Sequence, residues 1–414
     1  MSVLHPPVLG FNELSFKASE AIRTSAFSIY HVFARAFAHL PSFLTSDVAI
    51  DQPNNVIDAG EPLMGKRKIA FPCRTSNVAA YDRNFLQKLL TSVESRRVAA
   101  RVKKRAATAH AFLSLAHPAE FRPLGEDEIP LVLLTHNDLK FLRSFLAHYR
   151  RLGVTRFICV DDLSTDGTRE FLTGEPDVDI WTSEVRYREA RRGRLWREAL
   201  FAMYGKNRWY LNVDSDEYLV YQDCFESGLP QLIRRLEEQG VYRLSAPMID
   251  MYPPGPPSQY PFAGVDETMP WSVASCFDGN DYTLDITKRF LQLRGGPRKR
   301  KFGSDVDLIK YPLLYWDDKC GLGTTIHKPL PYHRNFFPIS AALLHFKFFS
   351  DYKEKTTQAV EEKQHIGEAR EYQKILQALT EDGDVNFVYD GTLQYSDPED
   401  LIRQGFIHPV WADS

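Results

Sequence analysis

The sequence has few cysteines, no long apolar run and little net charge, and each of these absences excludes a class of protein. Its five cysteines are odd in number and scattered, without the spacing of a zinc site, so we expect reduced thiols. No stretch approaches the roughly 18 to 20 apolar residues of a membrane span, and the first residues lack a signal-peptide pattern. We expect a cytoplasmic protein, either soluble or attached at the cytoplasmic face of the membrane.

The charge and composition are those of an ordinary globular enzyme. A formal net charge of −3 over 414 residues gives no reason to expect a nucleic acid partner. The content of 43% hydrophobic and 25% charged residues indicates a substantial core. Because the length exceeds one comfortable domain, we predict three parts. These are a helical N-terminal extension at 1–125, a catalytic domain at 126–350, and a C-terminal helix with a wrapping tail at 351–414.

The predicted extension contains candidate helices at 15–40 and 84–115, separated by a turn-rich stretch. The second helix has hydrophobic residues at Phe85, Leu89, Leu90, Val93 and Val98. It also has a group of basic residues: Arg96, Arg97, Arg101, Lys103, Lys104 and Arg105. A basic amphipathic helix can lie on an anionic membrane. The alternative is a helix that packs on the catalytic domain with its charges in water, and the sequence leaves both open.

From residue 129 onward, short apolar runs alternate with amphipathic segments, which is typical of βα units around a mainly parallel sheet. The clearest helix is 139–152, where apolar residues recur at helical spacing, Asn137 or Asp138 can cap the start, and Gly153 ends it. A second helix is expected at 188–204. Strands are expected at 129–134, 157–160, 178–181, 209–213 and 242–248.

Acidic residues follow two of these strands, as Asp161-Asp162 and as Asp214-Ser215-Asp216. Ligands of an open parallel sheet bind beyond the carboxyl ends of its strands. Two carboxylates separated by one residue can share a Mg²⁺ or Mn²⁺ ion, which in turn bridges diphosphate oxygens. An isolated Asp-x-Asp is more often a solvated turn, but two acidic strand ends predict a site for a nucleoside diphosphate.

Several segments together resemble a known family. The segments 134–138 (LTHND) and 160–168 (VDDLSTDGT) resemble the opening of family-2 glycosyltransferases of the GT-A type, and 214–217 (DSDE) resembles their metal-binding DxD motif. The segment 343–347 (LLHFK) resembles a bacterial branch, in which it closes the donor site. The resemblance covers roughly residues 129 to 350, with Asn-Asp at 137–138 where the family often has Asn-Glu.

The resemblance implies a Rossmann-like GT-A fold and a metal-dependent, inverting transfer of a sugar. The donor would be a UDP- or GDP-sugar, and the acceptor would be a hydroxyl group of a glycan or glycolipid in bacterial cell-envelope synthesis. A divalent cation, Mn²⁺ or Mg²⁺, would be bound by Asp214, Asp216 and His345, with His327 as a rival for the histidine.

The remaining roles concern the donor and the base. The expected donor-binding residues are Thr135, Asn137, Asp161, Asp162, Arg194 and Glu217. Arg194 belongs to a group of arginines that could neutralise the leaving diphosphate. The base that removes the acceptor's proton is expected downstream, at Asp250 or Asp285.

Two other readings of the same residues stay open. A phosphohydrolase can use the first aspartate of an Asp-x-Asp as a nucleophile, but such enzymes usually have Thr or Val where this chain has Tyr218. A non-catalytic protein that binds sugars or membranes on the same fold is the other alternative. Loss of a needed carboxylate would favour it, and the expected carboxylates are present.

Overall fold

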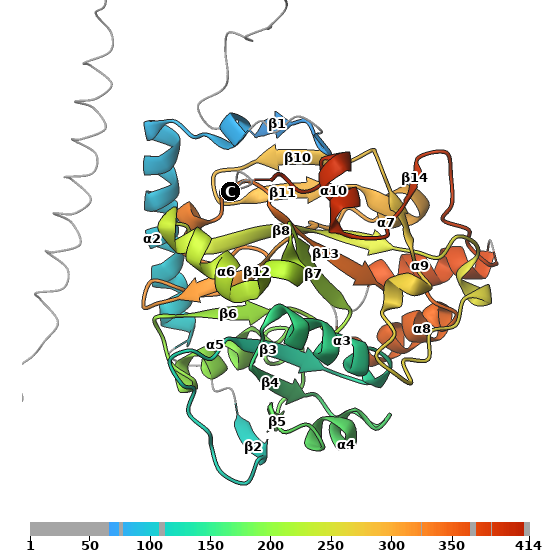
Figure 1. The fold of residues 1–414 in the computed structure, drawn as a ribbon, viewed down its shortest axis with the longest axis horizontal. Helices are drawn as coiled ribbons and strands as arrows, with labels where there is room; N and C mark the ends of the chain where they lie inside the picture. The colour runs from blue at the N-terminus through green and yellow to red at the C-terminus, as the bar shows by residue number, and fades with distance from the viewer. Residues whose placement is uncertain are drawn as a thin grey trace, which may run out of the picture. The chain divides into compact units, whose positions relative to one another are not determined.

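The computed structural model has a central sheet of nine strands (Figure 1). The structure describes residues 66–73, 78–106, 112–323, 325–364, 370–381 and 383–409, so the helix predicted at 15–40 lies outside the described residues. The order of the strands is β2-β5-β4-β3-β6-β12-β8-β13-β7. Their bounds are β2 Leu113–His117, β3 Pro130–Thr135, β4 Arg156–Asp161, β5 Val178–Ser183, β6 Arg208–Asn212, β7 Glu217–Tyr221, β8 Arg243–Met251, β12 Ile309–Trp316 and β13 Ala341–Phe346.

Most strands of this sheet point in one direction. β5, β4, β3 and β6 are parallel neighbours, and β8 and β13 form a further parallel pair. β12 is antiparallel to both β6 and β8, so β8 and β13 share the direction of the first four strands. Only β2 and β7, besides β12, run the other way. The predicted α/β fold with a mainly parallel sheet flanked by helices is confirmed.

The helices beside the sheet are α3 Leu139–Leu152, α4 Thr168–Thr173, α5 Arg194–Met203 and α6 Cys224–Glu238. In α3 the apolar residues at helical spacing are buried from Leu142 onward, and Gly153 ends the helix in the left-handed region at φ 102°. Asp138 makes no side-chain cap bond. Asp166 accepts from the Leu139 N–H at 3.1 Å instead.

The second predicted helix starts later than expected. Arg191, Arg192 and Gly193 all have positive φ, so α5 begins only at Arg194. Three successive left-handed residues cannot belong to a right-handed helix.

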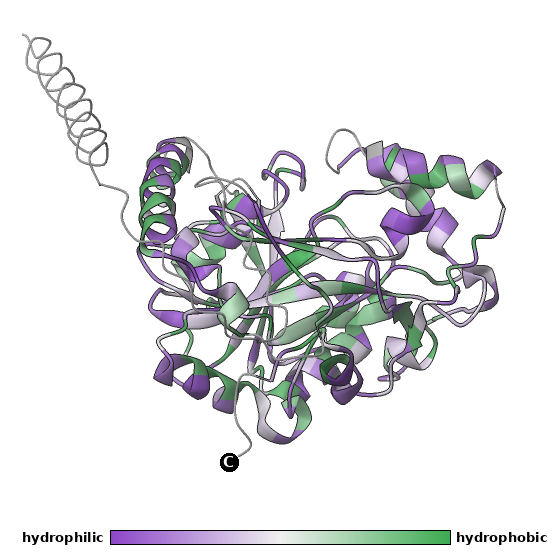
Figure 2. Ribbon diagram, turned by 90° about the horizontal axis from the view of Figure 1, so that it is seen from above, coloured by the Kyte–Doolittle hydropathy of each residue, from purple (hydrophilic) through white to green (hydrophobic). Residues whose placement is uncertain are grey.

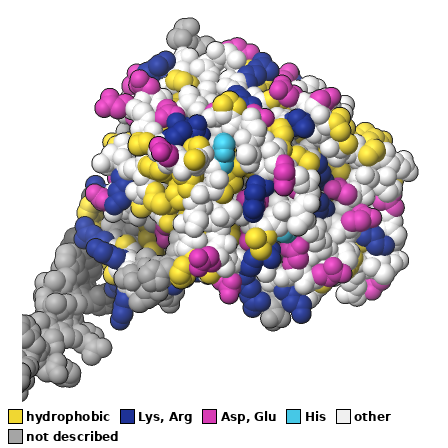
Figure 3. Space-filling view, turned by 90° about the horizontal axis from the view of Figure 1, so that it is seen from below, with side chains coloured by type: hydrophobic (Ala, Val, Ile, Leu, Met, Phe, Trp, Pro, Cys, Tyr) yellow, Lys and Arg dark blue, Asp and Glu magenta, His cyan; other side chains and the backbone are white. Residues whose placement is uncertain are grey.

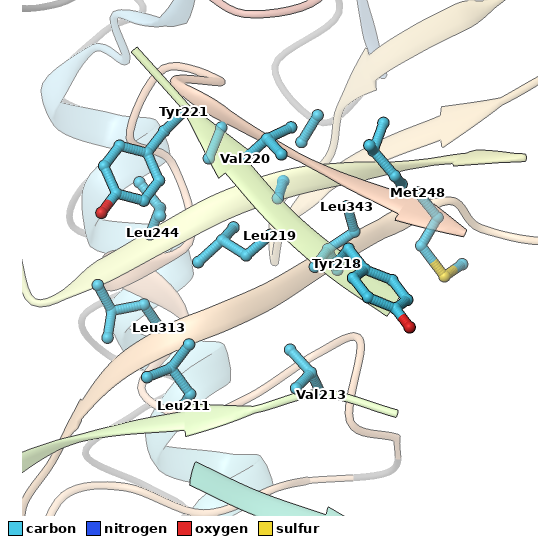
Figure 4. Packing of buried hydrophobic residues seen from close by; sticks show 14 of the residues in the cluster. Leu211, Val213, Tyr218, Leu219, Val220, Tyr221, Leu244, Met248, Leu313 and Leu343 are labelled. Atoms are coloured by element: carbon cyan, nitrogen blue, oxygen red, sulfur yellow. The ribbon is translucent and has the colours of Figure 1, made fainter. Parts of the chain in front are cut away.

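The hydrophobic core lies between the strands of the sheet and the helices on it. Figure 4 shows Leu211 of β6, Leu313 of β12, Leu219 of β7 and Leu343 of β13 packed together, and all four are fully buried. In Figure 2 much of the central strands is green, the colour of hydrophobic residues, whereas the surrounding helices show both green and the purple of hydrophilic residues. Such helices have one face in the core and one in water.

The other described elements surround this sheet. They are α2 Phe85–Ala106, α7 Gly296–Phe302, α8 Tyr352–Glu362, α9 Arg370–Glu381, α10 Pro398–Gln404, the strands β1 Arg67–Ile69, β9 Cys276–Asp278, β10 Thr283–Ile286, β11 Leu291–Arg294 and β14 Thr392–Gln394, and the 3₁₀ helices η1 Val78–Tyr81, η2 Pro257–Gln259, η3 Pro270–Ser272 and η4 Tyr332–Arg334. β1, β10 and β11 form a separate antiparallel sheet, and β14 pairs with β9. The helix predicted at 84–115 is shorter than expected, because 113–117 is strand β2.

The division into three parts stays a prediction, although contacts cross both expected boundaries. β2, from the predicted extension, pairs with β5, and β14, from the predicted tail, pairs with β9. Among the described residues, no helix is long and apolar enough to cross a membrane. On the face drawn in Figure 3, basic and acidic side chains are intermixed.

Candidate functional site

A cavity of about 280 Å³ lies at the carboxyl ends of β3, β4 and β6. Residues that directly follow these strands line it, as expected for a mainly parallel sheet. The end of β13 and the helices α3, α5, α8 and α9 also contribute to the wall, so segments far apart in the sequence meet here. The lining includes Thr135, Lys140, Asp162, Asp216, Lys347 and Lys355.

The first aspartate of the acidic turn after β6 is held by two cations. Asp214 accepts a hydrogen bond from Arg197 Nη2 at 2.7 Å and another from Lys310 Nζ at 2.6 Å. Burial alone would raise the pKa of Asp214, but Lys310 and Arg197 hold it well below its usual value. Lys310 also binds Glu217. Both carboxylates are therefore tied to the neighbouring strand β12.

The second aspartate, Asp216, points toward the end of β13. Its Oδ2 atom lies 2.9 Å from Lys347 Nζ and 3.5 Å from His345 Nε2. Burial would raise the pKa of Asp216, but Lys347 and His345 keep it well below its usual value. The carboxylate is thus charged and faces the cavity.

Asp216 belongs to a candidate metal site. One ligand atom each from Asp216, Glu217 and His345 lies within 4.8 Å of the others. Two carboxylates and an imidazole suit a divalent ion such as Mn²⁺. Of the three predicted ligands, Asp216 and His345 are brought together, while Glu217 rather than Asp214 is the third member. Metal binding itself stays a prediction.

His345 lies between this group and Asp250. Its Nδ1 atom is 2.6 Å from Asp250 Oδ1. Arg298 donates to the same carboxylate from Nε at 2.8 Å and from Nη2 at 3.0 Å. Asp250 is 2% exposed. The residue expected as the base therefore contacts the site only through His345.

Neither predicted base is among the described residues that line the cavity. Asp285 lies on β10 in the separate sheet, where its carboxylate is 3.7 Å from Lys66 Nζ. The acidic residues that do line the cavity, within the described part of the chain, are Asp138, Asp162, Asp214, Asp216 and Glu362.

The predicted donor residues divide into two groups. Thr135 and Asp162 line the cavity, and Asp162 accepts from Arg186 Nε at 2.9 Å. Asp161 is buried and binds Arg169 Nε at 2.8 Å, which fixes the loop after β4. Asn137 also supports this loop, because its Oδ1 accepts from the Thr165 N–H at 2.7 Å.

Two further predicted residues lie behind the lining. Arg194 donates to the backbone carbonyls of Arg191 at 3.0 Å and Gly323 at 2.5 Å. His327, the rival to His345, donates from Nδ1 to the Ile309 carbonyl at 2.8 Å. Burial and the nearby Lys310 lower the pKa of His327 to about 4.

Sequence reasoning missed the lysines of this site. Lys140, Lys347 and Lys355 line the cavity, and Lys355 also donates to the Asn137 carbonyl at 2.7 Å. Lys310 interrupts an apolar strand, which is the signal that could have identified it. The lining lysines occur on α3, after β13 and on α8, where a charged residue carries no such signal.

No protein-family model and no curated protein matches the sequence. A solved structure described as "Crystal structure of 4-diphosphocytidyl-2C-methyl-D-erythritol synthase" is similar to part of the chain. The TM-score is 0.23 and the identity 14%, over 47% of this chain and 76% of that chain. A similarity of this size does not indicate a function.

Proposed function

We propose that the chain is a metal-dependent glycosyltransferase that binds a nucleotide-sugar donor in the cavity at the ends of β3, β4 and β6. The observation that carries the proposal is the combination of charges in that cavity. Asp216 with His345 and Glu217 provides ligands for a divalent ion, and Lys140, Lys347 and Lys355 provide positive charge beside them. A diphosphate bound to a divalent ion needs both.

The proposed roles follow from position. Asp162 and Thr135, at the ends of β4 and β3, contact the nucleoside. The three lysines oppose the charge of the diphosphate. Asp216, Glu217 and His345 hold the ion, which stabilises the negative charge of the leaving diphosphate. The acceptor is a hydroxyl group of a glycan or glycolipid.

The phosphohydrolase alternative fits the site less well. It requires a free oxygen of Asp214 to attack a phosphorus atom. Both oxygens of Asp214 are engaged, one by Arg197 and the other by Lys310. This favours the transferase.

The proposal also includes contact with an anionic membrane through α2. One face of α2 packs on the body of the protein through Thr91, Ser95 and Val98, which are buried. Val98, one of the five apolar residues named for this helix, is therefore not available to a membrane. The opposite face exposes Phe85, Leu86, Leu89 and Val93, followed along the helix by the exposed cations Arg96, Arg97, Arg101, Lys103 and Lys104. Apolar and basic groups together fit the interface of an anionic bilayer.

Calorimetry with Mn²⁺ tests the donor site. We expect UDP or GDP to bind more tightly when Mn²⁺ is present, and Asp216→Ala to abolish that difference. Asp162→Asn should weaken nucleotide binding by roughly tenfold, the equivalent of about 1.4 kcal/mol. Asp285→Asn, which removes a carboxylate outside the cavity, is the matched control and should bind like the wild type. Nucleotide binding that ignores both Mn²⁺ and Asp216→Ala would contradict the proposal.

A further inference from the structure

The sheet places three ionisable residues in one row across β7, β13 and β8. His345 of β13 pairs with Glu217 of β7 on one side and with Asp250 of β8 on the other. Directly paired residues of neighbouring strands project from the same face of a sheet. The imidazole therefore lies between one carboxylate of the proposed metal group and a carboxylate outside it.

The two ring nitrogens of His345 have different neighbours. Nδ1 is 2.6 Å from Asp250 Oδ1, whereas Nε2 is 3.5 Å from Asp216 Oδ2. A carboxylate next to one ring nitrogen keeps a proton there and leaves the other nitrogen with its lone pair. Because Asp250 lies closer to Nδ1 than Asp216 does to Nε2, Nε2 is the nitrogen that would give up its proton and offer its lone pair to an ion bound at Asp216. This is the tautomer that a metal ligand needs.

Asp250 is itself fixed by Arg298 of α7. The guanidinium binds both carboxylate oxygens, at 2.8 and 3.0 Å. The side chain of Asp250 is 1% exposed and that of Arg298 is 9% exposed. A bidentate pair of this kind holds the carboxylate in one orientation. Arg298 in turn lies 3.6 Å from Glu371 of α9, which also accepts from Ser304 at 2.6 Å. The orientation of Asp250 on β8 thus depends on two helices, α7 through Arg298 and α9 through Glu371.

We propose that Asp250, held by Arg298, is a positioning residue that fixes the tautomer and orientation of His345 for binding a divalent ion. The inference rests on the proposed function, because it concerns the same metal site. It gives Asp250 a role different from that of a base. Partners that orient a ligating histidine typically change metal affinity by roughly 10- to 100-fold.

Mn²⁺ titration of the full chain without nucleotide tests this role. We expect Asp250→Asn to weaken Mn²⁺ binding by roughly 10- to 100-fold. Asp278→Asn is the matched control. Asp278 is also 2% exposed and is bound at both oxygens by Arg300, at 3.0 and 2.7 Å, but its other side-chain contact is Tyr252 rather than a histidine. It should bind Mn²⁺ like the wild type.

A second readout follows the histidine itself. In metal-free protein with ¹⁵N-labelled histidine, at a pH alkaline enough for the imidazole to carry a single proton, the His345 resonances, assigned from their loss in His345→Gln, should report that proton on Nδ1. Asp250→Asn should shift them toward a mixture of tautomers, and Asp278→Asn should not. A purely structural role for Asp250 would affect folding stability in both variants and the tautomer in neither.

The outcomes separate this inference from the proposed function. If the wild type and Asp216→Ala bind Mn²⁺ equally, the metal site itself is refuted. If Asp216→Ala loses binding but Asp250→Asn matches Asp278→Asn, only the positioning role is overturned. Should Asp250→Asn fail to fold, Arg298→Lys decides, because lysine keeps the charge but not the two-point contact. Unchanged Mn²⁺ affinity and tautomer in Arg298→Lys would overturn the role.

Discussion

At the scale of a residue, the surroundings of an ionisable group decide what it does. His148 of α3 is fully buried and donates from Nε2 to the Leu219 carbonyl at 2.9 Å. Aromatic rings surround it, including those of Tyr218 and Trp271. Burial lowers the pKa of His148 to about 4. The folded protein therefore holds this imidazole in its neutral form.

This lowered pKa predicts a loss of stability in mild acid. The unfolded chain binds a proton at His148 below a pH of about 6.5, while the folded chain resists it down to about 4. The stabilisation is present above pH 6.5 and is lost as the pH falls toward 4. Between pH 7.5 and pH 5 it amounts to about 2 kcal/mol.

Urea unfolding at both pH values measures the effect. In His148→Gln, which keeps a donor for Leu219 but cannot titrate, the decrease in unfolding free energy between pH 7.5 and pH 5 should be smaller by about 2 kcal/mol. Other titrating groups are common to both proteins and cancel. An equal decrease in both would show that His148 is not the cause.

The sequence predicted part of the site at this scale. Asp162 could be located because it directly follows β4, and Asp216 because it lies in the turn after β6, since the cavity lies where parallel strands end. The partners of the acidic turn could not, because Lys310 comes from an antiparallel strand that inserts between β6 and β8. Pairing between distant strands leaves no local pattern in the sequence.

At the scale of an element, helix periodicity was a good guide and helix ends were not. The apolar spacing of α3 predicted its bounds and its buried face. The start of α5 was misplaced, because positive φ at Arg191 and Arg192 has no signal in those residue types. The predicted helix at 84–115 was too long, because its last residues belong to strand β2, which pairs with β5.

The exposed face of α2 gives a prediction for this element. Vesicles that contain anionic lipid should co-sediment the protein at physiological salt, and neutral vesicles should not, because each cation near the surface contributes about 1 kcal/mol. Reversing the charge of Arg96, Arg97 and Arg101 should abolish the binding. Reversal of Arg234 on α6 is the control and should leave it intact. Binding that survives the triple reversal would show that α2 has a structural role only.

At the scale of the whole molecule, both ends of the described chain contribute to one core. The ring of Phe406 packs against that of Phe71, with 5.3 Å between centroids. The Cys73 N–H donates to the Gly405 carbonyl at 3.0 Å, and Tyr81 and His408 are hydrogen-bonded. Phe406 is fully buried, so this part of the expected wrapping tail belongs to the core.

Shortening that side chain should therefore destabilise the entire protein. Phe406→Ala should lower the free energy of unfolding by about 3 to 5 kcal/mol, because it removes buried apolar area and leaves a cavity. Val388→Ala, at a tail position that is 39% exposed, is the control and should cost far less. Chemical denaturation of both variants measures the difference. Equal stability of the two would mean that the tail packs on the surface only.

The row formed by Glu217, His345 and Asp250 separates two kinds of evolutionary change. Backbone hydrogen bonds across β7, β13 and β8 set these positions. A one-residue slip of β13 would turn its side chains to the opposite face, so insertions there are strongly disfavoured. A point mutation at position 345 leaves the backbone in place and changes only the ligand. Replacing the imidazole with a carboxylate would shift the preference of the proposed site toward Mg²⁺, so a lineage could change its metal without rebuilding its fold.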